Sequence, residues 1–163
     1  MKKLLIFLTL FTILFISSGQ TYEQQTLIPA MERYFPSEPF KGFLTLFQIP
    51  YWGMTISVEE RGYYPFVEFV IRKASHVVIF GLIALAVLNL LPKPKTGLAL
   101  GITAVIALAD EFHQSLTGGR TPTGQDVLLD VFGAVLFLGA AKFLKKNKKE
   151  FSTSIRSLRA QRR

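Results

Sequence analysis

Four apolar segments of nearly membrane-spanning length constrain the fold of this chain more than any other feature. They cover about residues 4–19, 66–91, 98–116 and 127–144. A bilayer span needs about 20 mostly apolar residues. The last three segments come close to that length, and the first does so only if Ser17, Ser18 and Gly19 are counted. The sequence therefore predicts an all-α integral membrane bundle of four transmembrane helices.

The first segment also has the features of a secretory signal peptide. Lys2 and Lys3 precede the apolar stretch Leu4 to Ile16, and small residues follow it. We favour a retained helix, although the sequence leaves cleavage open. Both interpretations place residue 20 outside the cell, so the topology of the remaining chain is the same under either.

The distribution of basic residues predicts the orientation of the bundle. With a cytoplasmic N-terminus, 13 of the 19 Lys and Arg residues lie on the inner side, which agrees with the positive-inside rule. Ten of the 11 acids lie on the outer side. We therefore predict a multi-pass protein of a bacterial cell membrane, with both ends in the cytoplasm.

The net charge of +8 does not indicate nucleic-acid binding. Basic residues concentrate in the tail at 145–163, which directly follows an apolar segment. Such a tail is typical of attraction to anionic lipid headgroups. The sequence lacks the interleaved aromatic and basic residues of a nucleic-acid groove. The expected partners are therefore membrane lipids, and a homo-oligomer is also compatible with the sequence.

The connections between the apolar segments differ in kind. Residues 92–96 contain two prolines and predict a tight cytoplasmic turn. Residues 117–123 predict a short outer turn. Residues 20–65 form a long extracytoplasmic loop rich in aromatic side chains, which usually lie at the headgroup level. We expect this loop to cover the outer surface as a partial cap, with a short helix near 27–34.

Ionisable residues inside spans are costly and are therefore functional candidates. The three later helices and the turn before the last one carry ten polar candidates: Arg72, Lys73, His76, Asp110, Glu111, His113, Gln114, Arg120, Asp126 and Asp130. Spacings of three and four residues place several of them on shared helix faces. Antiparallel topology brings all three patches to a similar depth near the outer surface. The sequence thus predicts one buried polar cluster that opens outward.

Several chemistries fit this cluster. A divalent metal ion held by the two histidines and the carboxylates is one alternative, although the zincin pattern is missing and neighbouring basic residues weaken cation binding. No cofactor is expected, and the absence of cysteine excludes thiol chemistry. An outer-leaflet hydrolase or phosphoryl-transfer enzyme would use His and carboxylate as general acid and base. A structural or assembly role would use the charges to fix helix register. We favour ligand binding, because Arg is suited to phosphate and carboxylate groups.

The polar motifs resemble those of the VanZ-like family of bacterial membrane proteins. The resemblance covers about residues 1–144 and leaves out the basic tail. It rests on Arg-Lys-Ala-Ser-His at 72–76, Asp-Glu-Phe-His-Gln at 110–114, Gly-Arg at 119–120 and Asp-Val-Leu-Leu-Asp-Val-Phe-Gly at 126–133. It implies a multi-helix membrane protein linked to resistance to glycopeptide antibiotics, notably teicoplanin. Under this resemblance, the ligand would be an envelope precursor or a glycopeptide.

Overall fold

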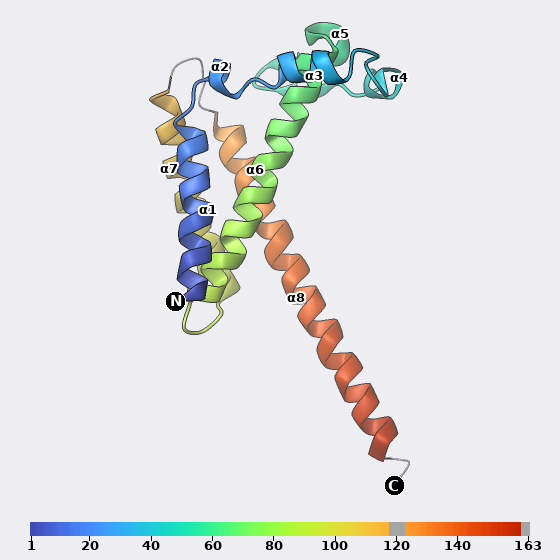
Figure 1. The fold of residues 1–163 in the computed structure, drawn as a ribbon. Coiled ribbons are helices and arrows are strands. Elements are labelled where there is room, and N and C mark those ends of the chain that lie inside the picture. Colours follow the sequence, from blue (N-terminus) through green and yellow to red (C-terminus); the bar gives the residue numbers. More distant parts are fainter. Residues whose placement is uncertain (118–122, 161–163) are drawn as a thin grey trace.

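Four long helices and a small compact segment make up the chain (Figure 1). The structure is a computed structural model that describes residues 1–117 and 123–160, without the side chains of Lys149 and residues 152–160. The long helices are α1 (Lys2–Ser18), α6 (Tyr63–Leu90), α7 (Thr96–Ser115) and α8 (Gly124–Ala160). The segment between α1 and α6, residues 19–62, lies across one end of the bundle, and we call it the cap segment.

The helices fit a membrane protein. Within the described residues, three are long and apolar enough to cross a membrane: α6, α7 and residues 124–148 of α8. The predicted membrane protein is confirmed at this level. Helix α1 has only 17 residues and is not among the three, so the fourth span stays a prediction.

Local sequence explains where the long helices start and stop. Gly62 precedes α6 with a φ of 87°, which a residue without a Cβ adopts easily. Leu91 ends α6 in an extended conformation because Pro92 follows it. Helix α8 continues to Ala160, well beyond the apolar stretch that was predicted to end at residue 144. After residue 144 the sequence changes from apolar to basic, but the helix continues through this change.

Helices α6 and α8 cross in close contact, and two glycines permit it. A Cβ added at Gly133 would overlap the backbone of Val77. That Cβ would lie only 2.8 Å from the Cα of Val77. A Cβ at Gly81 would overlap the ring of Phe137. Small residues allow helix backbones to approach closely in membranes. The crossing continues into a buried apolar core that includes Phe80, Ile83, Ala84, Ala134 and Leu138.

Helix α1 packs onto the same core. Leu14 is buried in it, and Phe7 and Leu10 lie against it. The ring of Phe15 stacks on His113 of α7, with centroids 4.5 Å apart. Helix α1 therefore packs as part of the bundle, and its retention in the mature protein stays a prediction.

The cap segment contains more structure than the sequence suggested. It holds α2 (Tyr22–Gln25), α3 (Ile28–Tyr34), α4 (Lys41–Leu44), β1 (Ile49–Tyr51), β2 (Met54–Ile56) and α5 (Val58–Arg61). Helix α3 matches the short helix expected near 27–34. The antiparallel pair β1–β2 corrects the purely α-helical expectation. Its strands of three residues are too short to show a clear alternation of side chains, and its turn has positive φ at Trp52 and Gly53.

Candidate functional site

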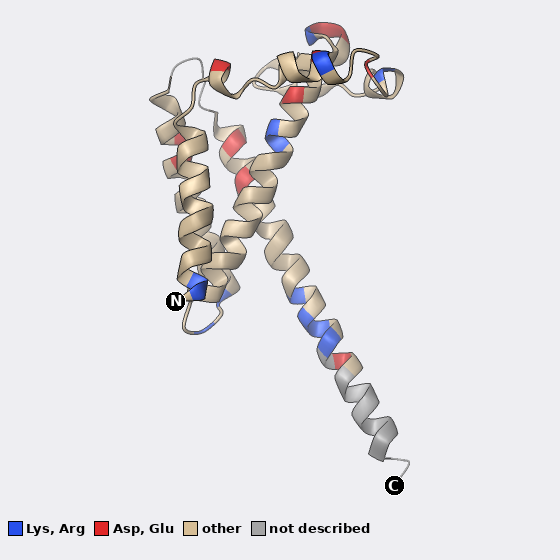
Figure 2. Cartoon of the chain, viewed as in Figure 1, with Lys and Arg blue, Asp and Glu red and all other residues tan. Residues whose placement is uncertain are grey.

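Charged residues divide the bundle into two levels (Figure 2). The acids of α6, of α7 and of the first turns of α8 lie in the half nearest the cap segment, together with the basic residues of α6. Lysines mark the opposite end of the bundle and continue along α8. The predicted concentration of ionisable groups at one level is therefore visible in the fold.

The deepest polar group is formed by one residue from each of three helices. His76 of α6, Asp110 of α7 and Asp130 of α8 have ligand atoms that all lie within 4.8 Å of one another. His76 Nδ1 lies 3.1 Å from Asp130 Oδ1. The two aspartates are buried, at 6% and 1% exposure, and His76 is half-buried. We call these three residues the inner trio.

Uncharged side chains hold Asp110 in place. Ser18 Oγ, at the end of α1, donates a hydrogen bond to Asp110 Oδ1. Gln114 Nε2, one turn further along α7, donates to Asp110 Oδ2 at 2.6 Å. Ser18 was not among the residues chosen from the sequence, where it appeared only as a small residue after an apolar run. Helix α1 thus contributes directly to the polar cluster.

Glu111 lies beside the trio and joins α7 to the start of α8. Its Oε1 accepts a hydrogen bond from the backbone N–H of Thr123 at 2.5 Å. Its Oε2 is buried, and within the described ranges it has no hydrogen-bond partner. The carboxylate is 8% exposed. Glu111 therefore adds a further buried acidic group to this level of the bundle.

The basic residues of α6 are paired with other acids. Lys73 Nζ makes an ion pair with Asp126 Oδ1, and it also contacts the hydroxyl of Tyr51 at 2.8 Å. Tyr51 comes from β1 of the cap segment and donates to Asp126 at 2.6 Å. Burial and the hydrogen bond to Asp126 raise the pKa of Tyr51 well above its usual range. Sequence reasoning missed this tyrosine, since an aromatic in a long loop gives no signal of its target.

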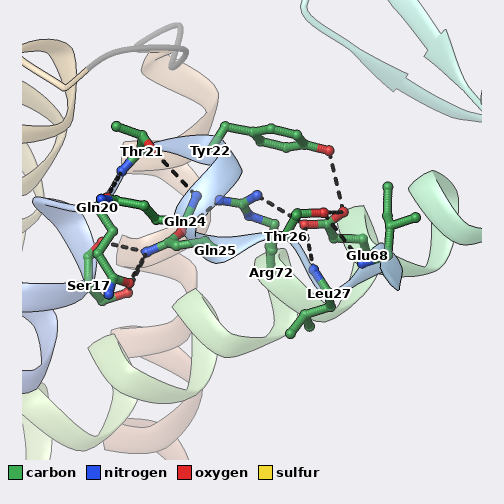
Figure 3. A network of polar contacts seen from close by, with 11 residues as sticks. Ser17, Gln20, Thr21, Tyr22, Gln24, Gln25, Thr26, Leu27, Glu68 and Arg72 are labelled. Carbon is green, nitrogen blue, oxygen red and sulfur yellow. Dashed lines mark hydrogen bonds and ion pairs between the residues drawn. The ribbon is translucent and has the colours of Figure 1, made fainter. Parts of the chain in front are cut away.

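Arg72 belongs to a separate network that fastens the cap segment to α6 (Figure 3). Its guanidinium contacts Glu68 at 3.2 Å and Gln25 at 2.6 Å. Glu68 is 1% exposed and also accepts from the Tyr22 hydroxyl, the Thr26 hydroxyl and the Leu27 N–H. Burial and the neighbouring Glu68 raise the pKa of Tyr22. We call Glu68–Arg72 and Lys73–Asp126 the rim pairs.

The two further predicted site residues are His113 and Arg120. His113 stacks on Phe15 of α1, the helix whose Ser18 also contacts Asp110, so the two residues share a face as their spacing predicted. Arg120 lies outside the described residues, as does most of the turn at 117–123. The predicted cluster is thus brought together in part, as a trio with two rim pairs beside it.

A groove with a volume of about 530 Å³ runs between α1 and α6 and reaches the trio. Most of its wall is apolar, and its polar lining consists of Ser17, Ser18, Ser75 and His76. It opens at the side of the bundle, between α1 and α6. Its shape and lining suit an amphiphile with a long apolar part and a polar end.

Comparison with known proteins gives one match. A family model described as VanZ/LLP1 matches residues 3–145, which is most of the chain. No curated protein and no solved structure matches it. The matched range includes all ten polar candidates chosen from the sequence.

Proposed function

The chain belongs to the VanZ/LLP1 family, and from that premise we propose that it binds an amphiphilic envelope precursor at its polar cluster. The observation that carries this proposal is the groove between α1 and α6. The apolar walls provide room for a lipid chain, while His76 and Ser18 lie where a polar headgroup would end. The family resemblance adds the link to glycopeptide resistance, with teicoplanin as the antibiotic to test.

The proposal includes a topology. Helix α1 would act as a fourth span, and both ends of the chain would lie in the cytoplasm. The cap segment would then face the cell exterior, and the groove would open toward the outer leaflet. The lysines of α8 at the far end of the bundle support this orientation through the positive-inside rule.

The binding test uses the full chain in lipid nanodiscs and a photo-crosslinking long-chain prenyl phosphate as the probe. Ala74 lines the groove, so Ala74→Phe should fill it and reduce crosslinking by more than about tenfold. The matched control is Ala109→Phe, because Ala109 is exposed on α7 and does not line the groove. Equal crosslinking of the two variants would reject the groove as the binding site.

The cellular test measures susceptibility to teicoplanin. A deletion strain is complemented with the wild-type protein, with Ala74→Phe or with the control Ala109→Phe, at membrane levels matched by immunoblot. We expect only the wild-type protein and Ala109→Phe to restore tolerance. Full restoration by Ala74→Phe would separate the resistance phenotype from the groove.

A second function, hydrolysis or phosphoryl transfer, is favoured by one specific contact. The buried Asp130 carboxylate holds Nδ1 of His76 at 3.1 Å, an arrangement that orients an imidazole for work as a general base through Nε2. The rim pairs engage Arg72 and Lys73 with acids, so these two cations are not available as a simple phosphate clamp. Release of inorganic phosphate from the prenyl phosphate probe by wild-type protein, lost in His76→Ala, would favour this function over binding alone.

A further inference from the structure

The inner trio presents the donor set of a cation site. One imidazole and two carboxylates converge from three helices, and their ligand atoms lie within 4.8 Å of one another. Two ligands bound to one ion at about 2.1 Å lie no more than about 4.2 Å apart, so only a small adjustment of side chains would be needed. Oxygen donors combined with one imidazole suit Mn²⁺ and Zn²⁺ better than Ca²⁺.

The charge balance of this region favours a cation. In the part of the chain that the structure describes, Asp110 and Glu111 form no ion pair with Lys, Arg or His, and Asp130 pairs only with His76. Asp110 and Asp130 are almost fully buried. Uncompensated buried charge is unfavourable, particularly within a bilayer.

The objection raised from the sequence does not hold for the two basic residues of α6. Neighbouring basic residues were expected to weaken cation binding. Arg72 instead contacts Glu68 and Gln25, and Lys73 contacts Asp126 and Tyr51. The basic side chains of α6 are therefore engaged at the rim pairs and not with the two aspartates of the trio.

A separate observation also indicates a missing ligand. Glu111 Oε2 is buried and has no hydrogen-bond partner among residues 1–117 and 123–160. A buried carboxylate oxygen without a donor is rare and needs an explanation. Glu111 lies near enough to Asp130 for the two carboxylates to repel each other, so a cation at the trio would also offset the charge of this acid.

From these observations we propose that His76, Asp110 and Asp130 bind a divalent cation of the Mn²⁺ or Zn²⁺ type. Ser18 and Gln114 hydrogen-bond to the two oxygens of Asp110 and orient the carboxylate, as outer residues do in metal sites. The cation would stand at the polar end of the groove, where it would attract an anionic headgroup. The inference rests on the proposed function because it places the cation at the same site. Binding of the metal itself requires no lipid ligand.

The test uses the full-length protein in detergent. A chelator first removes bound metals, Mn²⁺ is then added, and its binding is followed by electron paramagnetic resonance. We expect about one tightly bound Mn²⁺ per chain, with a spectral coupling to a histidine nitrogen. The chain has only two histidines, so the source of the nitrogen can be assigned. His76→Ala should remove the coupling, and His113→Ala should keep it. Wild-type protein without bound Mn²⁺ or Zn²⁺, or a coupling that persists in His76→Ala, would overturn the proposal.

Further variants test the carboxylate ligands and their support. Asp110→Asn and Asp130→Asn should each weaken Mn²⁺ binding by more than about tenfold, and Gln114→Ala by about tenfold. Glu59→Gln is the control for loss of one acid, because Glu59 is exposed in the cap segment. Undiminished Mn²⁺ binding by Asp130→Asn would contradict the site. If a variant fails to fold, the nitrogen coupling of the wild-type protein still decides the question.

The same preparations distinguish failure of this inference from failure of the proposed function. Prenyl phosphate crosslinking that is unaffected by chelator, in protein that binds no Mn²⁺, would reject the cation and keep the lipid site. Mn²⁺ bound at the trio in protein that does not crosslink the probe would confirm the cation and reject the lipid ligand.

Discussion

The rim pairs and the inner trio lie close together but satisfy their charges in different ways. Each rim pair joins one acid to one base, and the cap segment adds hydrogen bonds to both. In the trio, the single histidine pairs with Asp130, and Asp110 is held by uncharged donors. Neighbouring polar clusters in one bundle thus have different roles. The balanced rim pairs fasten the cap segment, whereas on our proposal the trio binds a cation.

The largest effect should come from breaking the rim at Glu68. Glu68→Ala removes the acceptor for Arg72 and for three groups of the cap segment. We expect the free energy of unfolding to fall by about 3 kcal/mol, because a partly buried arginine loses its counter-charge. Thermal unfolding in detergent and limited proteolysis of the cap segment measure the effect. Glu59→Ala is the control, and an equal loss of stability in both variants would contradict the structural role of the rim.

Removal of one charge from the trio should not destabilise the protein, in contrast to the loss of Glu68. Asp130→Asn in metal-free protein should leave the free energy of unfolding within about 1 kcal/mol of the wild type, or raise it, because a buried charge is lost. Added Mn²⁺ should raise the unfolding temperature of the wild type, because the ion binds only the folded state. The variant should show no such rise. A metal-free variant several degrees less stable than the wild type would make the trio structural.

A double-mutant cycle sharpens the distinction at the second rim pair. Lys73→Met, Asp126→Asn and the combined variant should give a coupling free energy of about 1 kcal/mol, since the pair is only partly exposed. Unfolding measurements at low and high salt check the value, and salt should reduce it. A coupling near zero would mean that the pair is incidental to the fold.

The smallest effect should be a change in the pH dependence of stability. Because the pKa of Tyr51 is raised in the folded protein, its neutral form favours folding, and this contribution is complete below the ordinary tyrosine pKa of about 10. Stability from this residue should therefore decline as the pH rises above 10. Tyr51→Phe should flatten that decline relative to the wild type, as measured by unfolding between pH 8 and 11 (about two units below and one above that pKa). If Tyr51→Phe leaves the pH dependence of stability unchanged, Tyr51 does not contribute to the stability of the Lys73–Asp126 pair.

The sequence was sufficient to predict the level at which the polar residues meet. Antiparallel helices place residues at equal depth side by side, so His76, Asp110 and Asp130 could be brought together from helix length alone. Partners within a helix turn were harder to predict. Arg72 and His76 share a face by spacing, yet Arg72 contacts the cap segment while His76 contacts α8. Two residues that share a helix face by their spacing can therefore still contact two different neighbouring elements.

The residues that sequence reasoning missed depend on distant contacts. Tyr51 reaches Asp126 from 75 positions away, and Ser18 reaches Asp110 from 92 positions away. Neither contact leaves a local pattern, because the first depends on how the cap segment folds and the second on how α1 docks. Glu68 lies near the start of a span, where an acid is also compatible with simple exposure to water.

The unbroken course of α8 gives the site a fixed depth. Asp130 and Lys142 lie 12 positions apart on this helix, which corresponds to about 18 Å. If the lysines stay at one surface of a hydrocarbon layer about 30 Å thick, Asp130 lies about 12 Å below the other surface. A thinner bilayer would bring the trio closer to water, and a thicker one would bury it further. The helix would thus make access to the site depend on the lipid composition of the membrane around it.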